Sequence, residues 1–230
     1  MEKSRWSETV EWDIETWKRA FEFWELEINW TGIERALEIG ARRGGPSRWL
    51  AQKGIEVDCT DRKNTLSTAG AVKQIEEENL KISFFDLDVL DLLEIEKYDL
   101  IICKSVLGGV GHHGQNQKIS QAISNIHQAL KPGGVFLFAE NLESSPIHRI
   151  LRKKLIRWGE GWNYLPFSQL KEFFVEFAEC KISSTGFLST FGRSEKQRTI
   201  LAKIDRIILP IIPQKWNYLG YGIAKKEHEN

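Results

Sequence analysis

The segment that most constrains the fold is a glycine turn that directly follows an apolar strand, at residues 36–45. It reads Ala-Leu-Glu-Ile-Gly-Ala-Arg-Arg-Gly-Gly, with Glu38 two positions before Gly40 and Gly44 four positions after it. Glycine lets the backbone turn sharply and come close to a ligand, and the N–H groups of a following helix face that ligand. A strand, a glycine turn and a helix in this order predict an open α/β sheet with its ligand beyond the carboxyl ends of the strands.

The rest of the chain alternates short apolar runs with helical stretches, which is typical of a parallel sheet with crossover helices. We expect strands near residues 34–39, 55–60, 82–86, 98–104, 134–140, 181–184 and 216–225. Proline and glycine bound several of the expected helices, at residues 46–52, 117–130, 167–179 and 194–209. The fold class is therefore α/β, and a chain of 230 residues is long enough to bury a full core.

The first 32 residues have a different, fully helical pattern. Apolar residues in steps of four and three form one stripe of a helix over residues 10–28, namely Val10, Ile14, Trp17, Phe21, Trp24 and Ile28. The opposite side is also apolar, with Trp12, Phe23, Leu26 and Trp30. We expect residues 1–32 to be an N-terminal helical cap in front of a main domain at residues 33–230. One side of its helix would contact the domain core, and the other a cap, a partner subunit or substrate; the alternative is a helix buried within its own fold.

Acidic residues follow the next two strands at positions that suit a nucleoside. Asp61 lies 21 residues beyond Gly40, where a carboxylate can accept hydrogen bonds from both hydroxyls of a ribose. Asp88 follows the third strand and could accept from an adenine amino group, with apolar neighbours such as Val89 beside the ring. A dinucleotide loop needs a second glycine at the position of Arg42. The sequence therefore favours a nucleoside cofactor without a pyrophosphate.

Residues 34–141 resemble the class I S-adenosyl-L-methionine (SAM)-dependent methyltransferases. Residues 37–45 are similar to the acid-x-Gly-x-Gly-x-Gly motif of this family, residues 85–88 to the segment that reaches adenine, and residues 130–134 to the turn before the fifth strand. The resemblance implies a Rossmann-like three-layer sandwich, with a mostly parallel seven-stranded sheet whose last strand is antiparallel. It also implies SAM as the cofactor and S-adenosyl-L-homocysteine as its product.

On this resemblance, the cofactor-binding residues lie in the loop and at the strand ends: Glu38, Gly40, Ala41, Arg42, Gly44, Asp61, Asp88, Val89 and Cys103. Arg42 departs from the pattern, because it stands at the middle glycine of the motif. A guanidinium there could pair with the methionyl carboxylate, so we expect SAM binding to survive. The alternative is a noncatalytic binding or regulatory protein whose altered loop no longer holds the cofactor productively.

The loop after the fourth strand contains the candidate catalytic residues. Residues 106–114 are rich in glycine and include His112 and His113, and the loop lies at the cofactor end of the expected sheet. A histidine could act there as a base near neutral pH, with His113 the leading candidate. The alternative is a solvated or helix-capping histidine. An alcohol acceptor needs such a base, whereas a neutral amine or an acidic phenol needs less help.

A basic amphipathic segment follows the fifth strand, within residues 146–175 that could form a lid. Its apolar face consists of Ile147, Ile150, Leu151, Leu155 and Trp158, and five basic residues occupy the rest. An ordinary surface helix, a lid for an anionic or sugar-containing acceptor, and peripheral contact with an acidic membrane surface are all compatible with this pattern. The apolar run at residues 207–213 could add a partner or membrane contact, although burial in the core is the preferred interpretation. An oligomer is also compatible with the sequence.

Composition narrows the partners further. Thirty-two basic and 32 acidic residues give a net charge of zero, so no nucleic-acid partner is expected. The three cysteines have no metal-binding spacing, so no metal is expected. The start of the chain resembles no signal peptide and no stretch is apolar enough to span a membrane, so we expect a cytoplasmic protein.

Together these features predict a methyl transfer from SAM to a small-molecule acceptor by in-line displacement. A hydroxyl is the preferred acceptor group, and an amine is the alternative. A nucleotide-sugar oxidoreductase is a further alternative, against which the missing second glycine argues.

Overall fold

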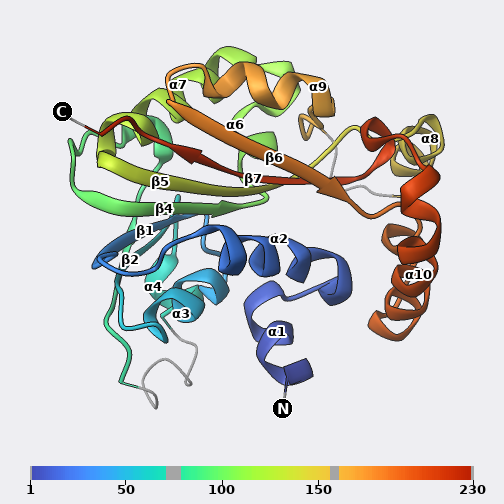
Figure 1. Cartoon of the computed structure of the whole chain (residues 1–230), viewed down its shortest axis with the longest axis horizontal. Helices are drawn as coiled ribbons and strands as arrows, with labels where there is room; N and C mark the ends of the chain where they lie inside the picture. The colour runs from blue at the N-terminus through green and yellow to red at the C-terminus, as the bar shows by residue number, and fades with distance from the viewer. Residues whose placement is uncertain (1, 71–78, 156–160, 229–230) are drawn as a thin grey trace.

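The computed structural model describes residues 2–70, 79–155 and 161–228, and its centre is a seven-stranded sheet between two layers of helices (Figure 1). The strands are β1 (Arg35–Ile39), β2 (Glu56–Asp61), β3 (Ile82–Asp86), β4 (Tyr98–Lys104), β5 (Leu130–Asn141), β6 (Glu179–Thr185) and β7 (Leu219–Lys225). Their order is β3-β2-β1-β4-β5-β7-β6, and β7 runs antiparallel to both of its neighbours. The predicted fold class and the antiparallel last strand are confirmed.

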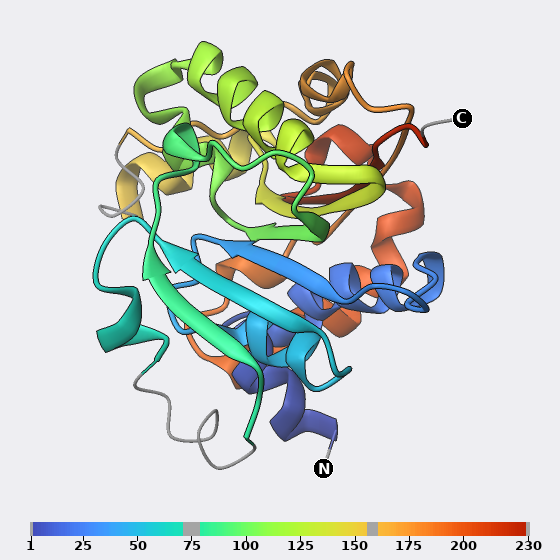
Figure 2. The same cartoon turned by 90° about the vertical axis from the view of Figure 1, so that its left-hand side faces the viewer.

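The helices form two layers and one end group, which Figures 1 and 2 show from two sides. One face of the sheet carries α1 (Glu2–Val10), α2 (Ile14–Glu27), α3 (Gly45–Ala51) and α4 (Thr65–Thr68). The other face carries α6 (Leu107–Val110), α7 (Asn116–Ala129) and α9 (Phe167–Leu170). Beyond the carboxyl ends of β5 and β6 lie α8 (Pro146–Leu155) and α10 (Glu195–Ile208).

Short 3₁₀ turns connect these elements at η1 (Val89–Asp91), η2 (His112–Gly114), η3 (Lys171–Phe174), η4 (Ser189–Phe191), η5 (Leu209–Ile211) and η6 (Gln214–Trp216). The core follows from the alternation of side chains along the central strands, which are buried on both faces. In β5, Leu137 packs into the cluster under α2 and α3, while Phe136 and Phe138 pack with Phe174 under α7. The first cluster also holds the predicted stripe of the N-terminal segment, with Trp17, Phe21 and Trp24 fully buried.

The helix predicted over residues 10–28 is confirmed over residues 14–27 as α2, but its start is wrong, because the chain breaks at residues 11–13 between α1 and α2. Glu11 and Asp13 both have left-handed backbones, with φ of 75° and 47°. The break is stabilised from far along the chain, since the Glu195 carboxylate of α10 accepts from Asp13 N at 2.9 Å and from Ile14 N at 3.2 Å. These N–H groups at the start of α2 would otherwise lack an intrahelical partner.

The helix predicted over residues 167–179 is also shorter than expected. Only α9 and η3 form, ending at Phe174. Ala178 N already donates to Lys225 O at 3.0 Å, and β6 begins at the next residue. Pairing with the edge of β7 therefore overrides the local helical tendency of this phenylalanine-rich segment.

Helix α1 lies directly against the start of α3, where Gly45 leaves no room for a side chain. A Cβ at Gly45 would lie 2.3 Å from Thr9 O and 2.8 Å from Glu8 O. The Arg48 guanidinium of α3 also pairs with the Glu8 carboxylate. α1 therefore covers the end of the glycine loop.

We expect Gly45→Ala to displace α1 and to destabilise the fold by about 1–3 kcal/mol, because the new methyl group meets backbone rather than a flexible side chain. Urea denaturation and limited proteolysis of residues 1–13 measure the two effects. Gly54→Ala, after the same helix, is the control, since a Cβ there meets open space and costs only the strain of its left-handed backbone. Equal proteolysis of both variants would contradict the prediction.

Candidate functional site

The glycine loop has the close packing that its sequence predicts. Gly40 has a φ of 70°, and a Cβ at this position would lie 2.4 Å from Val106 Cγ2. Ala41 N donates to Thr60 O at 2.9 Å, which holds the loop against the end of β2. The loop therefore lies across the carboxyl ends of β1, β2 and β4, at the edge where ligands of open α/β sheets bind.

Asp61 and Asp88 both lie at this edge, after neighbouring strands. The Asp61 carboxylate accepts from Arg42 N at 2.9 Å and from Arg62 N at 2.7 Å, so it directly faces the glycine loop. Asp88 follows β3 and accepts from Leu90 N at 3.0 Å. Both acids remain partly exposed at the end of the sheet. The structure thus brings together the loop and the two acids that the sequence singled out.

Glu38 is buried beneath the glycine loop and stabilises it. Its carboxylate is buried and accepts from Ser47 N at 2.8 Å and from Ser47 Oγ at 2.5 Å. Burial raises the pKa of Glu38 to about 8, although the bonds to Ser47 act in the opposite direction. Glu38 therefore ties β1 to the start of α3 and fixes the two ends of the loop that Gly40 and Gly44 turn.

Arg42 occupies a left-handed backbone conformation, with a φ of 51°, at the position where glycine would be easiest. Its side chain is 71% exposed, and its guanidinium pairs with the Glu11 carboxylate at 3.2 Å. The backbone N–H of Arg42, in contrast, points at Asp61. The substitution is therefore accommodated by turning the side chain toward the connection between α1 and α2.

Lys104 is a site residue that sequence reasoning missed. It ends β4 on the same face as Glu38, and its ammonium lies 5.2 Å from the centre of the Trp17 ring. Burial lowers the pKa of the Lys104 ammonium, and the nearby carboxylates of Glu11 and Glu38 partly offset this. Among the described residues, no acid lies within ion-pair distance of this ammonium. The sequence feature that could have identified Lys104 is a lysine at the end of an apolar strand.

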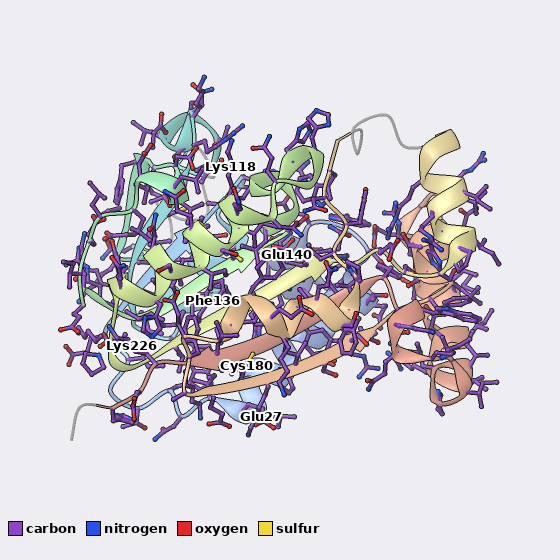
Figure 3. All side chains as sticks on the ribbon, turned by 90° about the horizontal axis from the view of Figure 1, so that it is seen from above. Glu27, Lys118, Phe136, Glu140, Cys180 and Lys226 are labelled. Carbon is purple, nitrogen blue, oxygen red and sulfur yellow. The ribbon has the colours of Figure 1, made fainter. Side chains whose placement is uncertain are left out.

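Glu140 is the second missed residue, and it lies at the end of β5 near the middle of Figure 3. Its Oε1 atom accepts from Val106 N at 2.7 Å and from Leu107 N at 2.8 Å, which holds the loop after β4. Burial raises the pKa of Glu140 to about 7. Its Oε2 atom is buried without a partner among the described residues. Cys103 directs its buried thiol to the same carboxylate at 3.8 Å, so its role toward a cofactor stays a prediction.

A polar pair lies beside these residues at the ends of β4 and β5. Asn141 Nδ2 donates to Ser105 Oγ at 2.8 Å. Ser105 has a φ of 59°, a conformation that costs energy outside glycine and that often occurs at functional sites. The pair offers hydrogen-bonding groups next to the glycine loop.

The two histidines after β4 are both exposed. Their rings meet edge to face with centres 4.2 Å apart, and His113 N donates to Gly161 O at 2.8 Å. Just before them, Gly108 packs against the indole of Trp162, because a Cβ there would lie 2.0 Å from its Nε1. The proposed base role of His113 or His112 stays a prediction.

The predicted lid is anchored at both ends of its described parts. Leu142 and Leu165 form an isolated β-bridge, and the Arg152 guanidinium lies 4.1 Å from the centre of the Tyr164 ring. Arg152 also donates to Leu142 O at 2.6 Å, so this basic residue of α8 points inward. Trp158, which the sequence placed on the apolar face of this helix, lies outside the described residues.

Neither a membrane span nor a metal cluster occurs in the described ranges. No helix there combines enough length and apolar character to cross a bilayer. No group of three or more His, Cys, Asp or Glu side chains there is arranged to hold a metal ion.

Comparisons with known proteins point to one family. Residues 37–136 match the family described as Methyltransferase domain. Over 118 residues, 50% of this chain, the sequence is 26% identical to the ubiquinone biosynthesis O-methyltransferase of Rickettsia typhi, and it covers 45% of that protein. The chain thus spans about half the length of this curated relative.

Solved structures share the fold at low sequence identity. A SAM-dependent methyltransferase from Archaeoglobus fulgidus is 17% identical with a TM-score of 0.60, and the similarity covers 93% of both chains. Phosphoethanolamine N-methyltransferase 2 of Haemonchus contortus, in complex with phosphomonomethylethanolamine and S-adenosylhomocysteine, is 17% identical with a TM-score of 0.60, over 92% of this chain and 53% of that one.

The part of the chain that matches the methyltransferase domain contains the glycine loop, and the whole chain shares its fold with a SAM-dependent methyltransferase of known structure. The matched residues 37–136 include the acids and glycines described above, from Glu38 through Asp61 to Asp88.

Proposed function

We propose that this protein transfers the methyl group of SAM to a hydroxyl of a small-molecule acceptor. The observation that carries the proposal is that the Gly40 loop, Asp61 and Asp88 meet at one edge of the sheet after three consecutive strands. These groups fit SAM, because glycine lets the backbone of the loop come close to a nucleoside and the two acids are hydrogen-bond acceptors for its ribose and adenine. When bound, SAM supplies a methyl group that is already activated for displacement.

Each residue of the proposed site has a role that follows from its position. Asp61 accepts from the ribose hydroxyls, and Asp88 with its neighbour Val89 receives the adenine. Gly40, Ala41 and Gly44 bring the backbone close to the cofactor, while Glu38 holds the loop in shape. Because SAM carries its own leaving group, the main task of the protein is to align the acceptor and to exclude water.

We propose Lys104 as the residue that pairs with the methionyl carboxylate of SAM. The sequence had suggested Arg42 for this role. Lys104 is partly buried at the same edge, with an aromatic ring rather than an acid next to its ammonium. Arg42 is exposed and already paired with Glu11, and such surface pairs contribute little to binding energy.

The expected result is that Lys104→Met weakens SAM binding about tenfold or more, whereas Arg42→Ala changes it less than about threefold. Calorimetric titration of SAM into the wild type and both variants measures this. If Arg42→Ala weakens binding more than Lys104→Met does, Arg42 rather than Lys104 binds the carboxylate. Equal affinity of all three proteins would show that neither residue binds SAM.

For the acceptor, the preference for a hydroxyl rests on the relative whose name is that of an O-methyltransferase. We propose that Ser105 and Asn141 orient the acceptor and that His113 or His112 accepts its proton. Residues 146–175 would then act as the lid and residues 1–32 as the cap. An amine acceptor is the second candidate, favoured by the N-methyltransferase of the same fold. The cytoplasmic location and the anionic or sugar-containing character of the acceptor stay predictions.

The decisive experiment measures released S-adenosylhomocysteine in a coupled assay with pooled phenols, sugars, amines and nucleotides. Activity on hydroxyl compounds supports the proposal, and activity on amines alone refutes its O-directed part. A noncatalytic role is favoured by one observation, namely Arg42 at the loop glycine. Mass spectrometry for copurified SAM or its product, together with the failure of every pool, would establish that role instead.

A further inference from the structure

Helix α10 presents an unpartnered apolar stripe to the outside of the molecule. Ile200, Ile204, Ile207 and Ile211 follow one another at steps of four, three and four, and each is between 41% and 81% exposed. Such steps place the four side chains on one side of α10 and of η5, which continues it. Single exposed isoleucines are ordinary, whereas a continuous row of four marks an interaction surface.

The exposed charges beside this stripe are basic. Lys196 and Lys203 are exposed on the same helix, while Arg206 pairs with the Glu15 carboxylate of α2 at 2.9 Å. The two acids of α10 lie on its other side: Glu195 accepts from the backbone of Asp13 and Ile14, and Asp205 accepts from the backbone of residues 187–189. The side of α10 that carries the isoleucines therefore has Lys196 and Lys203 and no acid of the same helix. We call Ile200, Ile204, Ile207, Ile211, Lys196 and Lys203 the α10 face.

Helix α8 lies at the same end of the molecule (Figures 1 and 3). It is joined to the α10 region through His148, whose Nε2 lies 2.7 Å from Phe187 O and whose ring stacks on Phe191 of η4. Its outer side adds two exposed isoleucines, Ile147 and Ile150. Both helices beyond the carboxyl ends of β5 and β6 therefore carry exposed isoleucines.

We propose that the α10 face docks the protein on the surface of an anionic lipid bilayer. A helix whose isoleucines enter the boundary between headgroups and acyl chains, with lysines beside them, gains both apolar burial and attraction to acidic lipids. A second copy of the chain is a less suitable binding partner for the α10 face than an anionic bilayer. A twofold pairing of this face would bring Lys196 and Lys203 of both copies together without acids to balance them.

Docking in this way has a consequence for the site, and it goes beyond the proposed methyl transfer. α8 follows directly after β5, whose end carries Glu140 and Asn141. Because α8 and α10 lie beyond the carboxyl ends of β5 and β6, docking through the α10 face would bring this end of the sheet near the membrane. A lipid-soluble acceptor would reach this edge without crossing water.

The test uses the purified full chain and sedimentation with vesicles of equal parts phosphatidylglycerol and phosphatidylcholine, or of phosphatidylcholine alone. We expect binding to the anionic vesicles that falls at least tenfold between 50 and 500 mM salt, on the order of the screening expected for surface charges. Ile204→Ser with Ile207→Ser should weaken this binding about tenfold or more, and Lys196→Glu with Lys203→Glu should do the same.

The control is Leu93→Ser with Ile95→Ser, which removes two apolar residues that are 83% and 74% exposed in the segment before β4. It should bind vesicles as the wild type does. SAM binding should be unchanged in every variant, so a failed vesicle experiment and a failed cofactor assignment give different results. The proposal is overturned if the wild type does not bind anionic vesicles, or if all variants bind them equally. It is also overturned if ultracentrifugation shows a dimer that the Ile204 and Ile207 substitutions dissociate.

Discussion

Replacing Asp61 by Asn is expected to weaken SAM binding about 10- to 100-fold, because hydrogen bonds to a charged group each contribute about 1.5–3 kcal/mol. Asparagine keeps one acceptor oxygen, so it can still hold the backbone N–H of Arg42, which lies 2.9 Å from Oδ2 in the wild type. Its NH2 group cannot accept from Arg62 N, which lies 2.7 Å from Oδ1 in the wild type, or from a ribose hydroxyl. The contact of Asp61 with the glycine loop through Arg42 N is therefore kept, while the acceptor for the ribose is lost.

Calorimetric titration with SAM and with S-adenosylhomocysteine measures the effect, and both ligands should lose affinity by the same factor because they share the ribose. Glu56→Gln is the matched control, since Glu56 is an exposed acid at the opposite end of the same strand. Its affinity for SAM should equal that of the wild type. Unchanged affinity in Asp61→Asn would remove the ribose assignment and with it the main support for the site.

The second large effect is a loss of stability as the pH rises from about 5 to about 8. Burial raises the pKa of three carboxyls, to about 6 for Asp13, about 8 for Glu38 and about 7 for Glu140. Between their ordinary and raised pKa values, the folded protein binds more protons than the unfolded chain. The stability contribution of each group is therefore fully present below its ordinary pKa and is lost as the pH rises through its raised pKa.

For Glu140 alone the change amounts to about 3 kcal/mol, because one pKa unit corresponds to about 1.4 kcal/mol. Urea denaturation at pH 5.5, 7 and 8.5 should show a falling free energy of unfolding. Glu140→Gln keeps an acceptor for Val106 N and Leu107 N but cannot ionise, so its stability should depend less on pH. Glu143→Gln, at a partly exposed acid nearby, should keep the slope of the wild type. A Glu140→Gln protein with the wild-type slope would show that this carboxyl does not cause the dependence.

Local sequence patterns were sufficient for the sheet and for much of the candidate site. Central strands buried on both faces produce long apolar runs, so β4 was predicted with its observed limits, and the acids beyond such runs were placed at the correct edge. Asp61 and Asp88 could be found because the carboxyl ends of parallel strands meet there.

Contacts between distant segments account for what the sequence did not reveal. The break between α1 and α2 depends on Glu195, which lies about 180 residues further along the chain. Lys104 and Glu140 look like ordinary charged residues after a strand, because only packing by other elements shows that they are buried. The outward turn of the Arg42 side chain likewise depends on Glu11, which a continuous helix would have placed elsewhere.

The cap that Glu195 provides for α2 also bears on how the protein is made. During synthesis the N-terminal helices leave the ribosome long before residue 195 exists, so their connection at Asp13 first forms without its partner. Contacts between such distant positions are costly to close and form late in folding. The helices that cover the glycine loop can therefore adopt their final arrangement only after α10 has been synthesised. A ribosome-bound fragment that ends before α10 also lacks β7, which joins β6 to the rest of the sheet, so it should contain at most the sheet formed by β1 to β5 and no stable cover over the cofactor edge.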